Sequence, residues 1–227
     1  MTDNTMSADS SWKGVIKAGG LSLLTGGAIV IIFILSVFIV QVQLPLTAES
    51  VLENPMPPVL LFCLAAFGEF LLMPGVLGLY FSLKDVNKNY AFMGTAVWLV
   101  AIPMFLVSRG QIISIATISG AYAAGDATVK AAYLASAHLA IEVANVYSVM
   151  ALDLLGVGAI TIGLVMLNGI FSKRTAYLVI VAGALTVVGT FGVILEPLTV
   201  GTLFGLILTG VWQIAVGLKL YRLGQEF

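Results

Sequence analysis

Six apolar stretches, each near the length of a bilayer span, most constrain what this chain can fold into. A helix of about 20 apolar residues crosses the ~30 Å hydrocarbon core of a membrane. The stretches lie at 19–43, 57–83, 89–120, 129–169, 175–195 and 198–222. The pattern predicts an all-α, six-transmembrane-helix bundle.

Composition excludes a soluble fold. Hydrophobic residues make up 60% of the chain and charged residues only 9%, whereas a soluble domain has about 25% charged residues to cover its surface. The net charge of −1 leaves no basic face for nucleic acid. Cys63 is the one cysteine, so an intramolecular disulfide is excluded. It lies in an apolar run, where a cysteine is typically a small packing residue.

The basic residues indicate how the bundle is oriented. Of the 10 Lys and Arg residues, one, Arg109, lies inside an apolar stretch. The connections at 44–57 and 193–198 hold none, and the turn near 120–130 holds only Lys130. All the others flank alternate ends of the stretches: Lys13, Lys17, Lys84, Lys88, Lys173, Arg174, Lys219 and Arg222. The positive-inside rule then predicts that both termini are cytoplasmic.

We expect a single membrane domain over residues 19–222. Residues 1–18 form a predicted flexible cytoplasmic N-terminus, and 223–227 a cytoplasmic tail. The first stretch is too long for the apolar region of a signal peptide and has no small-residue cleavage site after it, so we expect it to remain as a helix.

The third and fourth stretches are too long for simple spans. As helices they would measure roughly 46 and 61 Å at 1.5 Å per residue. A turn at 123–126 joins them, with Asp126 or Thr128 as the next N-cap. Either this long hairpin projects beyond the outer surface, or a helix is interrupted, at Gly156 or Gly158 in the fourth stretch or by a kink at Pro103 in the third.

Two other features concern packing. The connection 44–57 contains four prolines and is predicted to be an extended or turning segment that covers helix ends. Glycines within the stretches, including Gly201 and Gly205, allow close helix approach, either within the bundle or at a dimer seam.

Polar side chains inside the apolar stretches are the candidate site, because an ionised group there costs at least ~2.5–3.5 kcal/mol. They form the predicted ligand-binding set: Glu69, Arg109, Gln111, His138, Glu142, Asn145 and Asp153. The last four fall within an arc of about 80° on one helix at 100° per residue. We therefore expect this arc to face protein or water, toward the bundle interior with Glu69.

Equal counts from the Gly125 turn predict that Arg109 and Glu142 pair across the hairpin. Such a pair is either a structural lock or part of a functional site. Glu69 and Asp153 lie at similar predicted depth. They either share a proton or a cation, or are separately hydrogen-bonded to backbone or to Ser and Thr side chains.

Motifs for catalysis are absent from the sequence. His138 and Glu142 have the spacing of two zinc ligands, but a third would have to come from Asp153 or Glu69, and the chain has one histidine. We expect no metal or cofactor. Whether the chain is an enzyme stays open, and the catalytic residues, if it is one, stay unknown; the absence of these motifs favours a non-catalytic role.

Two segments carry a family resemblance. One is Gly163-Leu164 followed by Gly169–Leu178 and Gly183, and the other is Val211–Leu220, with its Trp, Gly and basic residue. They resemble uncharacterised prokaryotic six-helix membrane proteins that share a domain of unknown function, DUF4386. A proline is common in that family where this chain has Ser172-Lys173. The resemblance implies this architecture and a location in the cytoplasmic membrane of a prokaryote, and it implies no activity.

Two classes of function remain open. The first is a non-catalytic accessory subunit, or a protein that binds lipid or a small ligand. The alternative is a small transporter or intramembrane enzyme that uses the polar site on the fourth stretch. Expected partners are membrane lipids, with either other membrane subunits or a second copy of the chain.

Overall fold

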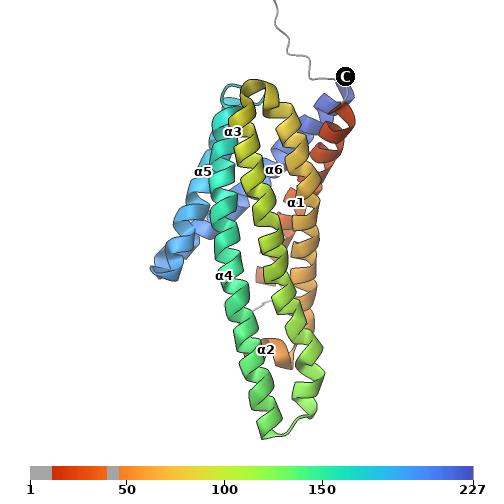
Figure 1. Cartoon of the computed structure of the whole chain (residues 1–227), viewed down its shortest axis with the longest axis vertical. Helices are drawn as coiled ribbons and strands as arrows, with labels where there is room; N and C mark the ends of the chain where they lie inside the picture. The colour runs from red at the N-terminus through yellow and green to blue at the C-terminus, as the bar shows by residue number, and fades with distance from the viewer. Residues whose placement is uncertain (1–11, 40–45, 227) are drawn as a thin grey trace, which may run out of the picture.

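The chain folds as a bundle of long helices (Figure 1). The computed structural model describes residues 12–39 and 46–226, so the predicted flexibility of residues 1–11 lies outside it. Two short 3₁₀ turns, η2 (Phe191–Val193) and η3 (Glu196–Leu198), join α5 to α6. The helices are α1 (Lys13–Ile39), α2 (Ala48–Glu53), α3 (Met56–Ala124), α4 (Ala127–Met166), α5 (Lys173–Thr190) and α6 (Thr199–Glu226).

Helix α3 is folded in two. Its 69 residues have helical backbone angles except at Asn87, where φ is −157° and ψ is 95°. The Asn87 side chain accepts a hydrogen bond from the Tyr90 backbone N–H (3.2 Å), so it caps the second half as an N-cap residue does. The chain turns back here, between the predicted second and third stretches (Figure 1). Counting α3 once, five helices of the described chain are long and apolar enough to cross a membrane.

The long helices pack in a ring. Helix α1 lies between α6 and the first half of α3, and the second half of α3 packs on α4. Helix α5 then joins α4 to α6. Trp98 and Trp212 meet inside the ring, with ring centroids 5.5 Å apart in a T-shaped contact that links α3 to α6. The main core of buried apolar residues surrounds this pair.

Glycines set the close approach of the helices. A Cβ at Gly156 would lie 2.8 Å from the Gly183 carbonyl oxygen of α5, and one at Gly158 would lie 2.9 Å from the Gly94 carbonyl oxygen of α3. Helix α4 is continuous through both positions, so the alternative of an interruption at these glycines does not occur. These glycines admit neighbouring backbones on two sides of an unbroken helix, which is the usual role of small residues between membrane helices.

The glycines predicted for a packing or dimer seam on α6 also pack internally. A Cβ at Gly205 would lie 2.8 Å from the backbone nitrogen of Thr186 on α5. A Cβ at Gly201 would lie 3.0 Å from the Leu185 carbonyl oxygen. This glycine pair therefore holds α6 against α5.

The α3–α4 hairpin extends well past the connection between α5 and α6 (Figure 1). Helix α4 has 40 residues and α5 has 18. Asp126 caps α4 by accepting a hydrogen bond from the Val129 N–H at 2.9 Å, which confirms one of the two predicted caps. Pro103 lies within α3 without leaving helical backbone angles.

Part of the proline-containing connection is helical rather than extended. Helix α2 has a capping box in which the Thr47 and Ser50 side chains each accept from the other residue's backbone N–H. The apolar residues of α2 pack against both α3 and α4 in a second, smaller core. Burial of Ala48, Val51 and Leu52 explains the difference, because an amphipathic turn of helix covers apolar surface better than an extended strand does.

One end of the bundle collects most of the basic residues, and we call it the basic end. The Lys17 ammonium lies 5.5 Å from the Tyr221 ring centroid, which joins the start of α1 to the end of α6. The Lys84 ammonium lies 5.7 Å from the Trp12 ring centroid, beside the Asn87 bend. The opposite end, with α2 and the α3–α4 turn, is the hairpin end.

Candidate functional site

A buried ion pair joins the two halves of α3. The Arg109 guanidinium donates two hydrogen bonds to Glu69 Oε1, from Nε at 3.1 Å and from Nη2 at 2.8 Å. The two side chains are only 14% and 11% exposed. Three aromatic rings surround the guanidinium carbon, which lies 5.9, 5.4 and 5.3 Å from the ring centroids of Phe33, Phe62 and Phe105. The cation is thus held by a carboxylate and by ring faces, which attract it electrostatically.

The predicted pairing of Arg109 with Glu142 is therefore wrong. Helix α3 contacts α4 through Ser108, the residue before Arg109, and the Ser108 and Ser148 hydroxyls lie 2.8 Å apart. Arg109 is one residue further along, about 100° around the helix, and its side chain reaches the first half of α3 instead. Glu142 is exposed.

Beside the ion pair lies a largely apolar cavity of about 270 Å³. Residues from α1, both halves of α3, α4 and α6 line it, so it sits inside the ring of helices. Its wall is mainly aliphatic and aromatic. Five polar residues also line it: Glu69, Arg109, Ser148, Thr209 and Gln213.

Two of these polar residues have a buried atom without a hydrogen-bond partner. Within the described ranges, three buried side-chain atoms lack one, and two of them, Glu69 Oε2 and Gln213 Oε1, belong to residues that line the cavity, although both atoms are themselves fully buried. Gln213 is only 1% exposed. By contrast, the Thr209 hydroxyl donates to the Gly205 carbonyl at 2.8 Å. Buried polar atoms are almost always hydrogen-bonded, so these two atoms are exceptions among the residues around the cavity.

The polar arc of α4 is not in this cavity. His138, Glu142 and Asn145 are exposed, near the hairpin end. Gly156, which packs against α5, lies about five turns from His138 and so on the same side of α4. The arc thus faces the side that α5 covers, but at a level beyond the end of α5. The prediction that it lines an interior site with Glu69 is wrong, because α5 is too short to cover it.

The rest of the predicted set is dispersed. Asp153 accepts a hydrogen bond from the Thr190 hydroxyl at 2.7 Å, at the last residue of α5, and so follows the predicted alternative of a separate Thr partner. The His138 Nε2 lies 3.6 Å from Glu49 Oε1 of α2. Gln111 is half-buried on α3. Of the seven candidates, the structure brings together Glu69 and Arg109 at the cavity.

Sequence reasoning missed Gln213 and the aromatic rings around Arg109. Gln213 lies in the sixth apolar stretch, and only five residues separate it from Lys219, so it could be taken for a residue near a helix end. Its polarity within an apolar stretch was nevertheless a usable signal. The three aromatic rings gave no such signal in the sequence, because Phe is common throughout the chain.

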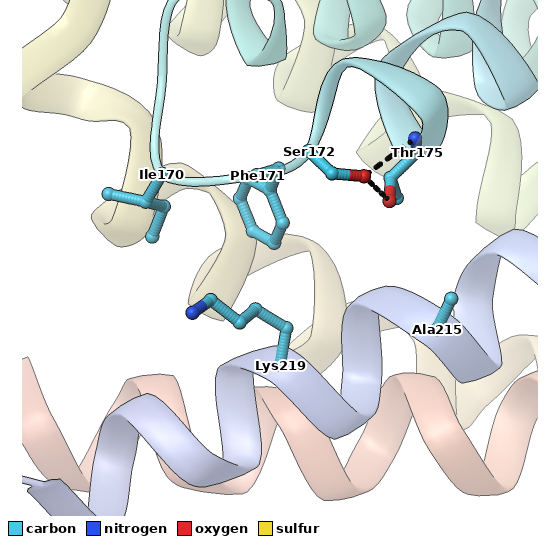
Figure 2. Close-up of a pocket in the computed structure, with 6 residues that line it drawn as sticks. All are labelled: Ile170, Phe171, Ser172, Thr175, Ala215 and Lys219. Carbon is cyan, nitrogen blue, oxygen red and sulfur yellow. Dashed lines mark hydrogen bonds between the residues drawn. The ribbon is translucent and has the colours of Figure 1, made fainter.

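A second hollow lies at the basic end, between the α4–α5 connection and α6 (Figure 2). Its volume is about 440 Å³, and Lys219 reaches from α6 toward this connection. The Ser172 hydroxyl caps α5 by accepting from the Thr175 N–H at 3.1 Å and lies 2.8 Å from the Thr175 hydroxyl. Because these hydroxyls serve the cap and Lys219 is exposed, the interior cavity is the better candidate site.

The described residues do not gather three His, Cys, Asp or Glu side chains in a position to hold a metal ion. His138 and Glu142 are far along α4 from Asp153, and Glu69 pairs with Arg109. The arrangement can instead solvate a polar group at one side of an apolar space.

Comparison with known proteins gives one match. A family model described as a domain of unknown function (DUF4386) matches residues 19–220. No curated protein and no solved structure matches the chain.

Proposed function

Since the chain belongs to the family of the domain of unknown function DUF4386 and has several helices apolar enough to cross a membrane, we propose that it is a non-catalytic, multi-pass membrane protein that binds an amphiphilic ligand inside its bundle. The observation that carries this proposal is the cavity beside the Glu69–Arg109 pair. A mostly apolar pocket with a few convergent polar groups is the usual form of a small-molecule site.

The cavity size limits the ligand. About 270 Å³ is at or just below the lower end of the roughly 300–1,000 Å³ found for ligand pockets. One alkyl or isoprenoid chain is compatible with this space, and a whole two-chain phospholipid is not. The aliphatic wall, which includes Ile29, Leu61 and Leu155, supports a chain rather than a polar metabolite.

The ion pair also supports binding. A buried pair is weak support for stability, since apolar residues of similar volume are often as stabilising or more so. The pair stands in a wall that is mostly apolar and that also includes Gln213. Recognition of a ligand's polar end explains why polar groups occupy these positions.

We also propose six membrane crossings with both termini cytoplasmic, in the cytoplasmic membrane. The bend at Asn87 allows α3 to cross twice. The gathering of basic residues at one end supports a cytoplasmic location for that end. On this placement the α3–α4 hairpin and α2 rise above the outer surface, because α4 has 40 residues, about twice what a bilayer needs.

Filling the cavity tests the proposed binding. Ala65 lines the cavity and is 7% exposed, whereas Ala66, its neighbour, does not line it. We expect lipid extracts of the purified wild type and of Ala66→Leu to contain a tightly held amphiphile at similar occupancy. Ala65→Leu should contain much less, because the added atoms occupy the same space, while its thermal stability in mild detergent is kept.

Each purified protein is washed in detergent and then extracted with organic solvent. Mass spectrometry of the extract gives the amount of amphiphile per protein chain. Equal amounts of ligand in the two variants would contradict binding in this cavity. So would a wild-type protein from which no stoichiometric amphiphile is recovered.

A further inference from the structure

We propose that Arg109 binds the head group of the ligand in the cavity, and that this head group is a carboxyl-type acceptor, a carboxylate or an ester carbonyl, on a single chain. This inference rests on the proposed function and names the chemistry that holds the ligand. It follows from the edge of the guanidinium that the ion pair leaves free, and from the depth of the pair in the bundle.

The ion pair uses only one edge of the Arg109 guanidinium. Nε and Nη2 share an edge of this planar group, and both donate to Glu69 Oε1. An arginine carries five N–H donors in a rigid fork. The pair engages two of them, so two donors on Nη1 and one on Nη2 remain. Within residues 12–39 and 46–226, these remaining donors have no acceptor.

The free edge of Arg109 is accessible, unlike the free oxygen of Glu69. Glu69 Oε2 is fully buried, whereas Arg109 Nη1 is not among the fully buried unpartnered atoms of the described chain and so keeps exposed surface. The side chains found around the guanidinium also line the cavity: Glu69, Phe33, Phe62 and Phe105. Because Arg109 is itself part of this wall, we place the exposed surface of Nη1 at the cavity.

Free N–H groups along one edge require an acceptor from the ligand. Two parallel N–H groups of an arginine match the two oxygens of a carboxylate, and a single one of them can donate to an ester carbonyl. A carboxylate brings a charge to a neutral ion pair and an ester does not, so the relative binding of the two distinguishes a fatty acid from an ester. An ammonium head group offers no acceptor, and its charge would lie against the guanidinium.

The depth of the pair corresponds to the head-group level of the outer leaflet. Glu69 lies 18 residues before the Asn87 bend, and Arg109 lies 22 residues after it. At 1.5 Å per residue, both are about 27–33 Å from the bend, and the hydrocarbon of a bilayer is ~30 Å thick. On the proposed orientation, with the bend on the cytoplasmic side, the pair therefore lies near the outer edge of the hydrocarbon.

The deeper part of the cavity accommodates the chain of such a ligand. Leu72 and Leu155 line the cavity and lie closer to the basic end than the pair does. Leu72 is 15 residues from Asn87 and Leu155 is 11 residues from Met166, the last residue of α4, which corresponds to about 22 and 17 Å. A chain with its carboxyl end at Arg109 extends toward them, as the chains of outer-leaflet lipids do.

The test is a competition between molecules that share one chain. The full-length protein, freed of bound lipid in mild detergent, is mixed with equal amounts of dodecanoate, methyl dodecanoate, dodecylamine and dodecane. Native mass spectrometry reports which is bound. We expect one molecule of dodecanoate or of methyl dodecanoate per chain, preferred at least about tenfold over dodecane and dodecylamine, as one hydrogen bond to a charged donor gives.

Two variants locate the head group. Glu69→Leu combined with Arg109→Leu removes the donors and the carboxylate together, so that neither charge stays buried alone. It should bind dodecanoate, methyl dodecanoate and dodecane within about threefold of one another, because only chain burial remains. Gln111→Leu changes a polar residue of α3 outside the cavity and should keep the preference of the wild type.

Glu69→Gln gives a change in the opposite direction. It keeps the Arg109 guanidinium and removes the negative charge beside it, so the binding of dodecanoate relative to methyl dodecanoate should rise several-fold. A head group bound away from the pair would not respond in this way. This variant and the wild-type competition decide the question if the double variant does not fold.

The outcomes separate the inference from the proposed function. Equal binding of all four molecules, a preference for dodecylamine, or an acceptor preference that the double variant retains would overturn the role of Arg109 while leaving a chain-binding cavity. Binding of none of the four would also overturn it. If the lipid extracts of Ala65→Leu and Ala66→Leu are then equal as well, the proposed function is overturned too.

Discussion

At the scale of single residues, the buried Glu69–Arg109 ion pair is the most sensitive feature of the structure. Glu69 and Arg109 are each less than 15% exposed, and the described structure gives Glu69 one bonded and one unbonded oxygen. A charge that loses its partner in such a place keeps the full desolvation penalty. Removing one member should therefore be more damaging than removing both.

Arg109→Leu alone should lower stability by about 3–5 kcal/mol, because it leaves the Glu69 carboxylate buried and unpaired. The double variant Arg109→Leu with Glu69→Leu should recover most of this loss. Glu142→Leu is the control: Glu142 is exposed, so its replacement should change stability by less than about 0.5 kcal/mol. Unfolding of the detergent-purified wild type, these three variants and Glu69→Leu measures the losses, and a loss in the double variant equal to the sum of the two single losses would contradict the pair.

At the scale of elements, glycine positions decide how closely helices approach. Gly156 faces the backbone of α5, where an added Cβ would meet Val187 and the Gly183 carbonyl. Gly120, on the long hairpin, has open space where a Cβ would be. The same chemical change at these two sites should therefore have opposite effects.

Gly156→Ala should destabilise the protein by about 1–3 kcal/mol, since α4 and α5 would have to move apart. Gly120→Ala should be neutral or stabilising by up to about 1 kcal/mol, because alanine favours helix and nothing obstructs it. The midpoints of thermal unfolding in detergent compare the two. A loss at Gly120 equal to that at Gly156 would show that close packing of α4 on α5 is not the cause.

At the scale of the whole molecule, the ends of the bundle differ in charge and in shape. The basic end holds the Asn87 bend and both described ends of the chain, and cation–ring contacts from Lys17 and Lys84 tie it together. The hairpin end carries the part of α3 and α4 that extends past α5 and α6. These features allow the proposed membrane orientation to be tested from outside the cell.

Single cysteines in a Cys63→Ser background test the orientation. A membrane-impermeant maleimide added to intact cells should label a cysteine at Lys130, in the hairpin, and should not label one at Lys88 or Lys173, at the basic end. Labelling at 88 and 173 after the cells are opened is the control for reactivity. External labelling of either basic-end position in intact cells would contradict cytoplasmic termini.

The sequence by itself determined the elements of this protein and some of their ends. Apolar stretches of spanning length predicted long helices, the Asp126 cap followed from local residue chemistry, and the turn-back near Asn87 falls at the predicted break between two apolar stretches. The family was also recognisable from short segments. These features depend on neighbours in the chain, so they can be read without knowing the fold.

Only the tertiary structure decided which polar residues meet. Spacing placed His138 and Gly156 on one side of α4, but the short α5 covers only the second of them. Equal depth suggested Glu142 for Arg109, whereas the rotation of α3 turned Arg109 toward Glu69. Gln213 joined them from α6. Periodicity relates residues within one helix, while the rotation and length of neighbouring helices decide what each side faces.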